Sequence, residues 1–167
     1  MTCRVFFALW PDDDTRARLG KLQSRFADGR RIPASNFHLT LAFLGEQPAE
    51  RVAALRSLPM RWTGFDCMLT LDKLGYFARQ RVIWAGCTAA PDCLLQLQED
   101  LMAAVDAQGI TLPERAAVFI PHVSLLRNAV CVPSPEMPAI RWRAQKMVLA
   151  QSVTGQGGVC YRVLAES

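Results

Sequence analysis

The chain contains two histidines, and each begins the same short pattern, His38-Leu39-Thr40-Leu41 and His122-Val123-Ser124-Leu125. Histidine has an unperturbed pKa of about 6.5, so it can accept or donate a proton near neutral pH. A hydroxyl side chain follows each histidine at the second position. Two imidazoles and two hydroxyls of this kind suit acid–base catalysis with hydrogen-bond donors for the oxygens of a phosphate group.

Two such groups brought face to face constrain the chemistry. A neutral imidazole takes a proton from water or a ribose hydroxyl, and an imidazolium protonates a leaving alkoxide. The hydroxyls of Thr40 and Ser124 can donate to the non-bridging oxygens of a phosphate between them. In-line displacement at phosphorus fits these parts, in particular the opening of a 2′,3′-cyclic phosphate, and it requires no metal or organic cofactor.

Other histidine chemistry is disfavoured by the surrounding residues. A metal site is not expected, because neither histidine has a carboxylate or cysteine at ligand spacing. A serine–histidine hydrolase is not expected, because the chain lacks a G-x-S-x-G turn.

Strands are the elements that must hold the two patterns. Side chains of a strand alternate between its faces, so His38 shares a face with Thr40, and His122 shares one with Ser124. We therefore predict that each strand presents one imidazole and one hydroxyl to a common surface. The apolar residues that alternate with them are expected to point into a core: Phe37, Leu39, Leu41, Phe43, Val123 and Leu125.

The remaining elements follow from periodicity and from turn residues. Helices are predicted from the Asp12–Asp14 run to a stop at Gly29, over residues 48–58, and from Leu94 to a stop at Gly109. A loop is expected at Gly75-Tyr76-Phe77. Strands are predicted over residues 4–10, 37–44, 65–74, 81–88, 118–126, 147–154 and 159–164. Short connections between intermixed strands and helices indicate an α+β fold with largely antiparallel sheets.

A coarse repeat accompanies this order. Each half has a long helix stopped by a glycine (Gly29 or Gly109), followed by a strand with a histidine pattern. A duplication of this kind would place two equivalent strands beside a pseudo-two-fold axis, with the histidines facing each other across it.

Length and composition bound the class of protein. A chain of 167 residues forms one compact domain, or two small lobes that share a core. Its net charge is +4 and its basic residues are mostly arginine, which indicates a phosphate-rich partner or simply a genome that favours arginine codons. We expect a soluble, cytoplasmic protein with no membrane partner, because we find neither a signal peptide nor an apolar run of transmembrane length. Monomer is the default.

The six cysteines are scattered along the chain without a C-x-x-C pair. They are expected to be reduced and mostly buried.

The paired H-x-[ST]-x motifs (HxTx motifs) resemble those of the 2H phosphoesterases. The match extends to the bacterial and archaeal RNA 2′,3′-cyclic phosphodiesterase branch, also called 2′-5′ RNA ligase-like. It is carried by segments along nearly the whole chain: residues 4–11, 36–45, 75–77, 81–86, 121–127 and 161–164.

This resemblance implies a single two-lobed domain over residues 1–167, with two α+β halves and antiparallel sheets that line a central cleft. The implied reaction hydrolyses a terminal RNA 2′,3′-cyclic phosphate to a 2′-phosphate, so the partners would be RNA or oligonucleotide ends. Reversible 2′-5′ RNA ligation is also implied. Carried over from the family, His38 would be the proton donor and His122 the acceptor.

Four further residues are candidates for substrate binding. Arg127 reaches the histidine face only if its strand ends or bulges there, because strict alternation places it opposite to His122. Arg81 beside Tyr76 and Phe77 would suit a stacked base with a nearby phosphate, or these residues form an ordinary hairpin with core aromatics.

Two other functions stay open. One is a 2H phosphodiesterase that acts on a small cyclic nucleotide or a nucleotide-sugar cyclic phosphate. The other is a non-catalytic RNA-end-binding module, which the two complete motifs disfavour because binding alone needs no proton donor and acceptor.

Overall fold

The computed structural model describes residues 2–110, 112, 118–130, 137–155 and 158–167. Its helices are α1 (Asp13–Gln23), α2 (Ala49–Leu55) and α3 (Asp92–Asp106), with 3₁₀ turns η1 (Ala34–Asn36) and η2 (Pro59–Trp62). Its strands are β1 (Thr2–Leu9), β2 (Arg30–Arg31), β3 (Leu39–Pro48), β4 (Cys67–Leu71), β5 (Lys73–Phe77), β6 (Val82–Gly86), β7 (His122–Arg127), β8 (Ile140–Ala144), β9 (Met147–Gly155) and β10 (Gly158–Glu166). No helix within these described ranges is long and apolar enough to span a membrane.

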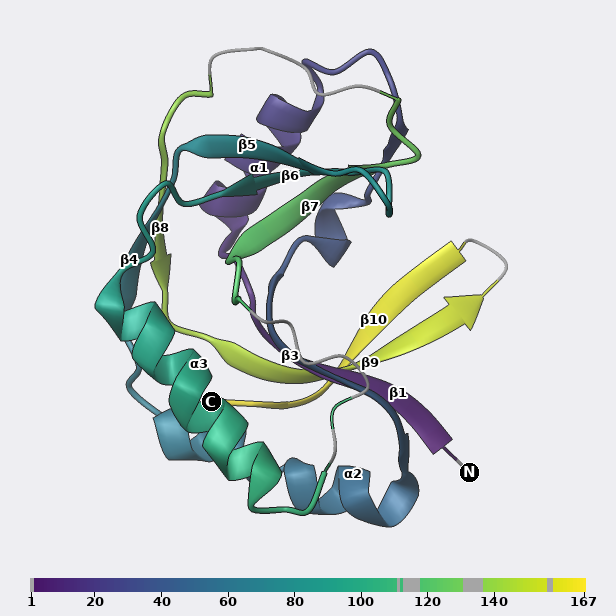
Figure 1. The fold of residues 1–167 in the computed structure, drawn as a ribbon, viewed down its shortest axis with the longest axis vertical. Helices are drawn as coiled ribbons and strands as arrows, with labels where there is room; N and C mark the ends of the chain where they lie inside the picture. Colours follow the sequence, from purple (N-terminus) through teal and green to yellow (C-terminus); the bar gives the residue numbers. More distant parts are fainter. Residues whose placement is uncertain (1, 111, 113–117, 131–136, 156–157) are drawn as a thin grey trace.

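One large antiparallel sheet runs through the protein in the order β10-β9-β1-β3-β7-β6-β5, with β2 paired to β7. Its two parts meet where Leu39 of β3 pairs with Val123 of β7. On one side of this junction lie β1, β3, β9 and β10, and on the other lie β2, β5, β6 and β7 (Figure 1). The predicted antiparallel α+β architecture, with the two histidine strands side by side, is confirmed.

The two lobes are not the two halves of the sequence. Helix α1, from the first half, packs against β7 and β8, whereas α3, from the second half, packs against β3. The C-terminal strands β9 and β10 extend the lobe that holds the N-terminal strand β1 (Figure 1). Each histidine strand is therefore backed by a helix from the other half, which a repeat along the sequence does not specify.

Helix α1 begins as predicted and ends earlier. The Asp12 side chain accepts a hydrogen bond of 2.7 Å from the Thr15 amide, which caps the helix. The helix ends at Gln23, and Gly29 lies beyond it with φ near 90°. A Cβ there would lie 3.2 Å from the Arg127 carbonyl oxygen. Gly29 thus lets the chain approach β7 and does not cap the helix.

Helix α3 matches its prediction closely. It ends at Asp106, shortly before Gly109. The apolar positions at helical spacing are buried: Leu94, Leu97, Leu101 and Val105.

The region after α2 differs from the prediction. Residues 75–77 lie within β5 and pair with β6, so the expected loop there is wrong. Strand β4 does not belong to the large sheet. It forms a separate two-stranded sheet with β8, a strand that was not predicted. Both differences arise from strand partners distant in the sequence, which periodicity alone does not reveal.

The cysteine prediction fails for one pair. Cys67 of β4 and Cys93 of α3 form a disulfide, with Cα atoms 6.0 Å apart. Their 26-residue separation closes in the fold because β4 and α3 come together. Cys3, Cys87 and Cys160 are free thiols as expected, but the expected burial is wrong for them, because Cys160 is exposed and the other two are half-buried. Cys131 lies outside the described residues.

Candidate active site

The junction of the two lobes places the histidine motifs beside each other. Leu39 and Val123, which pair there, are fully buried, so the residues on either side of them face the opposite surface of the sheet. Cross-strand neighbours have Cβ atoms about 4.5–5.5 Å apart. Extending the register by one residue in each direction places every histidine opposite the hydroxyl residue of the other motif: His38 opposite Ser124, and His122 opposite Thr40.

A backbone carbonyl fixes the ring orientation of each histidine. The Nδ1 atom of His38 lies 2.7 Å from the carbonyl oxygen of Asn36. The Nδ1 atom of His122 lies 2.7 Å from that of Ile120. A carbonyl oxygen can only accept a hydrogen bond, so Nδ1 carries the hydrogen in both rings. The Nε2 atom of each neutral ring is then left as a proton acceptor.

Aromatic rings enclose His38 on several sides. The ring centroids of Phe6 and Tyr161 lie 4.9 Å from that of His38, with Tyr161 edge-on. The Trp10 ring stacks at 5.8 Å. Because apolar rings replace water around the imidazole, the protonated form is disfavoured.

His122 has a similar but less complete aromatic enclosure. Phe77 lies edge-on at 4.9 Å, and Trp84 lies at 5.7 Å. Phe77, one of the candidate substrate-binding residues, is thus in direct contact with a candidate catalytic side chain. In this position Phe77 packs against the catalytic candidate His122. A direct contact between Phe77 and the substrate stays a prediction.

Both imidazoles have lowered pKa values. Burial lowers the pKa of His38 from 6.5 to about 4, and the hydrogen bond to Asn36 opposes this shift. The nearby positive charges of His122 and Arg127 lower it further. Burial also lowers the pKa of His122, and the hydrogen bond to Ile120 opposes that change. Both shifts favour the neutral form of the ring at pH 7.

A β-bulge follows the hydroxyl in both motifs. In the pairing of β3 with β1, the register skips Leu41. In the pairing of β7 with β6, it skips Leu125 at the equivalent position. A bulge adds one residue to a strand and reverses the alternation of faces beyond it. The residue three positions after each hydroxyl therefore returns to the histidine face.

The bulges decide the positions of Phe43 and Arg127. Phe43 was expected in the core opposite to His38, and this is wrong because the bulge at Leu41 turns it to the cleft. The bulge at Leu125 places Arg127 on the same face as Ser124, where both line the cleft. The condition set for Arg127, a bulge in its strand, is thus met.

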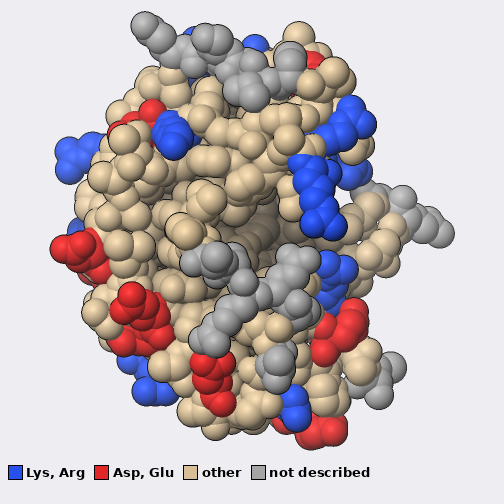
Figure 2. Space-filling model, in the orientation of Figure 1, with Lys and Arg blue, Asp and Glu red and all other residues tan. Residues whose placement is uncertain are grey.

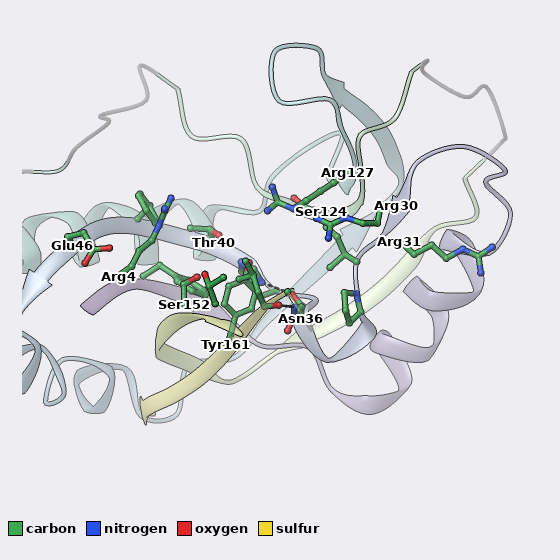
Figure 3. Close-up of a pocket in the computed structure, with 18 residues that line it drawn as sticks. Arg4, Arg30, Arg31, Asn36, Thr40, Glu46, Ser124, Arg127, Ser152 and Tyr161 are labelled. Atoms are coloured by element: carbon green, nitrogen blue, oxygen red, sulfur yellow. Dashed lines mark hydrogen bonds between the residues drawn. The ribbon is translucent and has the colours of Figure 1, made fainter. Parts of the chain in front are cut away.

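A cleft of about 930 Å³ opens over this surface, and Figure 2 shows the hollow with basic side chains along one rim. His38 is among the residues that line it, whereas His122 is not and is placed near it only by the extended register opposite Thr40. Among the described lining residues the charged groups are four arginines and one acid: Arg4, Arg30, Arg31, Arg127 and Glu46. Thr40 and Ser124 lie between the Arg4–Glu46 end and the Arg127–Arg30 end (Figure 3). The cleft is thus electropositive and suited to an anionic ligand.

Asn36 is a site residue that was not singled out from the sequence. Its side chain is buried, and Nδ2 donates a 2.8 Å hydrogen bond to the Val159 carbonyl of β10. Its own carbonyl is the acceptor for His38. The one signal in the sequence was its place two residues before His38. Its partner in β10 is set by the tertiary structure.

Two candidate substrate-binding residues lie away from the cleft lining. The Tyr76 hydroxyl donates a 2.9 Å hydrogen bond to the Ala129 carbonyl. Arg81 donates to the carbonyls of Ala129 and Asn128, at 3.3 and 3.2 Å. These bonds tie the chain after β7 to the β5–β6 hairpin. The geometry gives both residues a structural role, and their contact with substrate stays a prediction.

Comparisons with known proteins agree with this architecture. Residues 11–152 match the family model of the 2′-5′ RNA ligase superfamily. The RNA 2′,3′-cyclic phosphodiesterase of Escherichia coli (strain K12) is 43% identical over 64% of this chain, and the alignment spans 61% of that protein's length. The RNA 2′,3′-cyclic phosphodiesterase of Thermus thermophilus is 28% identical, over 96% of this chain and 87% of its own.

Solved structures match over nearly the full chain. E. coli LigT in apo form superposes with a TM-score of 0.84 at 31% identity, covering 99% of this chain and 96% of its own. E. coli LigT complexed with 3′-AMP also gives a TM-score of 0.84, at 33% identity over 100% and 98% of the two chains. The resemblance seen in the paired motifs is confirmed, and this chain belongs to the 2′-5′ RNA ligase superfamily.

Proposed function

We propose that this protein is an RNA 2′,3′-cyclic phosphodiesterase that hydrolyses a terminal 2′,3′-cyclic phosphate to a 2′-phosphate. The observation that carries the proposal is the pair of imidazoles, each with Nδ1 bound to a backbone carbonyl, which makes Nε2 the proton-accepting nitrogen of the neutral ring. The pairing of Leu39 with Val123, extended by one residue in each direction, supports a hydroxyl residue opposite each histidine. The names of the relatives and the 3′-AMP bound to E. coli LigT support a nucleotide substrate.

In the proposed reaction, water attacks the phosphorus and the P–O3′ bond breaks. Nε2 of His122 takes the proton of the attacking water, and Nε2–H of His38 gives a proton to the departing 3′ oxygen. This division of roles follows the family pattern. Thr40 and Ser124 donate hydrogen bonds to the non-bridging oxygens, and Arg127 balances the charge that develops on them.

The donor role requires His38 to be protonated when the substrate is bound. Burial holds its pKa at about 4, so the neutral ring predominates at pH 7. A cyclic phosphate carries a negative charge, and an opposite charge within a few ångströms raises the pKa of an imidazole. We therefore expect substrate binding to be coupled to proton uptake by His38.

The experiment is hydrolysis of an oligoribonucleotide with a 2′,3′-cyclic phosphate end, in EDTA, by the wild type, His38→Ala and His122→Ala. Each substitution should lower kcat by about 10²–10⁴-fold, the usual contribution of a general acid or base. The product should carry a 2′-phosphate, identified against synthetic 2′- and 3′-phosphate standards.

Two outcomes would contradict the proposal. One is the absence of turnover by a well-folded wild type, which would favour a small cyclic substrate or a binding role. The other is substantial activity in either histidine variant with its fold intact, as judged by circular dichroism.

A further inference from the structure

The shortest strand of the sheet consists of two arginines. Strand β2 pairs with β7 so that Arg30 lies directly opposite Arg127, and Arg31 lies opposite Leu126. Cross-strand partners in an antiparallel pair place their side chains on the same face. Arg127 faces the cleft because of the bulge at Leu125, so Arg30 faces the cleft as well. Figure 3 shows the two side chains close together beside Ser124.

No carboxylate among the described residues forms an ion pair with either arginine. Asp28, the acid nearest to Arg30 in the sequence, accepts a 2.6 Å hydrogen bond from the Val130 amide. Glu46, the acid in the described cleft lining, lies at the far end of the cleft (Figure 3). Like charges directly opposite each other in a sheet are unfavourable. Phosphate groups bound to the two arginines would offset that repulsion.

Arg31 is excluded as the equivalent contact. It also borders the cleft, but its guanidinium donates a 3.4 Å hydrogen bond to the Ser24 carbonyl at the end of α1. In Figure 3 its side chain extends away from Ser124 and Thr40. The tandem arginines therefore differ in direction, and Arg30 is the one that joins Arg127.

We propose that Arg30 binds the phosphodiester on the 5′ side of the terminal nucleotide. The enzyme then selects oligonucleotides that end in a 2′,3′-cyclic phosphate over mononucleoside cyclic phosphates. This inference rests on the proposed function, which places the reacting phosphate among the two histidines and the two hydroxyls. Arg30 lies one strand outside Arg127, and adjacent strands are about 4.8 Å apart. It thus reaches a second phosphate while Arg127 serves the first.

The chemistry of the contact fits guanidinium. Its planar fork binds two oxygens of one phosphate, which a point charge does not. A mononucleoside 2′,3′-cyclic phosphate offers only the reacting phosphate and leaves Arg30 unused. A dinucleotide with the same end supplies the second anion.

The test compares three substrates: uridine 2′,3′-cyclic phosphate, a diuridine with a 2′,3′-cyclic phosphate end, and the same diuridine with a neutral methylphosphonate linkage. For the wild type, kcat/KM should be about tenfold higher on the phosphodiester diuridine than on its methylphosphonate analogue. Arg30→Gln should lower kcat/KM about tenfold on the phosphodiester diuridine, and several-fold less on the methylphosphonate. This difference isolates the contact between Arg30 and the internal phosphate.

Arg51→Gln is the matched control. It removes the same charge from an exposed position on α2, outside the cleft lining, and should leave all three rates unchanged. Arg30 is exposed, so Arg30→Gln should keep the wild-type melting temperature. The slope of log kcat/KM against log salt for the phosphodiester diuridine should become shallower by about 0.7 in Arg30→Gln, the value for one phosphate contact on a single strand.

An equal loss for Arg30→Gln on all three substrates would overturn the inference and leave the proposed function intact. Equal wild-type rates on the two diuridines would do the same. If the wild type hydrolyses none of them, the proposed function fails. Binding of 2′-phosphate-ended diuridine and its methylphosphonate analogue, measured by calorimetry for the wild type and Arg30→Gln, then still decides whether Arg30 binds the internal phosphate.

Discussion

His38 and His122 are oriented by the same hydrogen bond, in which Nδ1 lies 2.7 Å from the carbonyl oxygen two residues earlier in the chain. The surroundings distinguish the two rings. His38 contacts three aromatic rings, whereas His122 contacts two. The fuller enclosure of His38 favours its neutral form, so the donor role assigned to it depends on the negative charge of a bound phosphate, which raises the pKa of the ring.

Asn36 is expected to act through His38 as a positioning residue. Asn36→Ala removes the hydrogen bond from Nδ2 to the Val159 carbonyl of β10. The backbone carbonyl of residue 36, which accepts the hydrogen bond from His38, is then held less firmly. We expect kcat to fall about tenfold with a small change in KM, because a misoriented acid slows the chemical step more than binding.

Asn36→Asp is the companion variant. It keeps the side-chain size and adds a negative charge near His38, so the pH–rate limb that reports His38 should move to higher pH. Asn36→Ala should not move it in that direction. Unchanged kcat in both variants would contradict a positioning role.

The hydroxyls of Thr40 and Ser124 are expected to serve as donors, and the additional methyl group of a threonine is expected to matter little. Ser124→Ala should lower kcat/KM by about 10–100-fold, since it removes a donor to the phosphate. Ser124→Thr keeps the hydroxyl and should stay within about threefold of the wild type. At position 40 the same comparison uses Thr40→Ser, which keeps the hydroxyl, and Thr40→Val, which replaces it with a methyl group. Steady-state kinetics on the cyclic-phosphate oligonucleotide would decide it, and a Thr40→Val enzyme as active as Thr40→Ser would contradict the donor role.

The stability of the protein should depend on pH through His38. Its pKa is about 4 in the folded protein against an ordinary 6.5, so the unfolded chain binds more protons between these values. The free energy of unfolding is therefore highest above pH 6.5 and falls as the pH drops toward 4, by about 2–3 kcal/mol from this group. The lowered pKa of His122 acts in the same direction.

Urea unfolding of the wild type and His38→Gln at pH 7.5 and pH 4.5 measures this contribution. The drop in unfolding free energy between the two pH values should be smaller in His38→Gln. An equal drop in both proteins would show that His38 does not contribute.

Gly75 is expected to be intolerant of a side chain. A Cβ at this position in β5 would overlap the indole ring of Trp84, which in turn packs against His122. Gly75→Ala should destabilise the protein by about 1–3 kcal/mol through overpacking and lower kcat by displacing His122.

Gly20→Ala is the control for the glycine substitution. Gly20 lies inside α1 with open space around its Cβ position, so alanine should stabilise the protein by about 0.5–1 kcal/mol. Thermal unfolding of the two variants should shift in opposite directions. A stable Gly75→Ala variant with normal kcat would contradict the role given to the Trp84 contact.

Several features of the site were predictable because they depend on local periodicity. The alternation of Leu39 and Leu41 with His38 and Thr40 predicted one buried and one open face, and the leucines are buried. The acidic start of α1 and the apolar spacing of α3 also predicted their helices, because caps and helical periodicity involve residues within a few positions of each other.

Strand partners and bulges were decided by the tertiary structure. Bulges at Leu41 and Leu125 arise from pairing with β1 and β6, and they turn Phe43 and Arg127 into the cleft. Neither leucine differs in type from a regularly paired residue, so the sequence carries no local sign of the change in alternation.

The amino-acid sequence by itself thus determined the chemical groups and which neighbours share a face, since these follow from residue type and the two-residue period of a strand. Only the tertiary structure decided which strands meet, because hydrogen bonds between strands join residues far apart in the chain. The pairing of Leu39 with Val123 brings the two motifs together, and that of Arg30 with Arg127 completes the basic rim. Both are non-local contacts that the packing of the whole sheet selects.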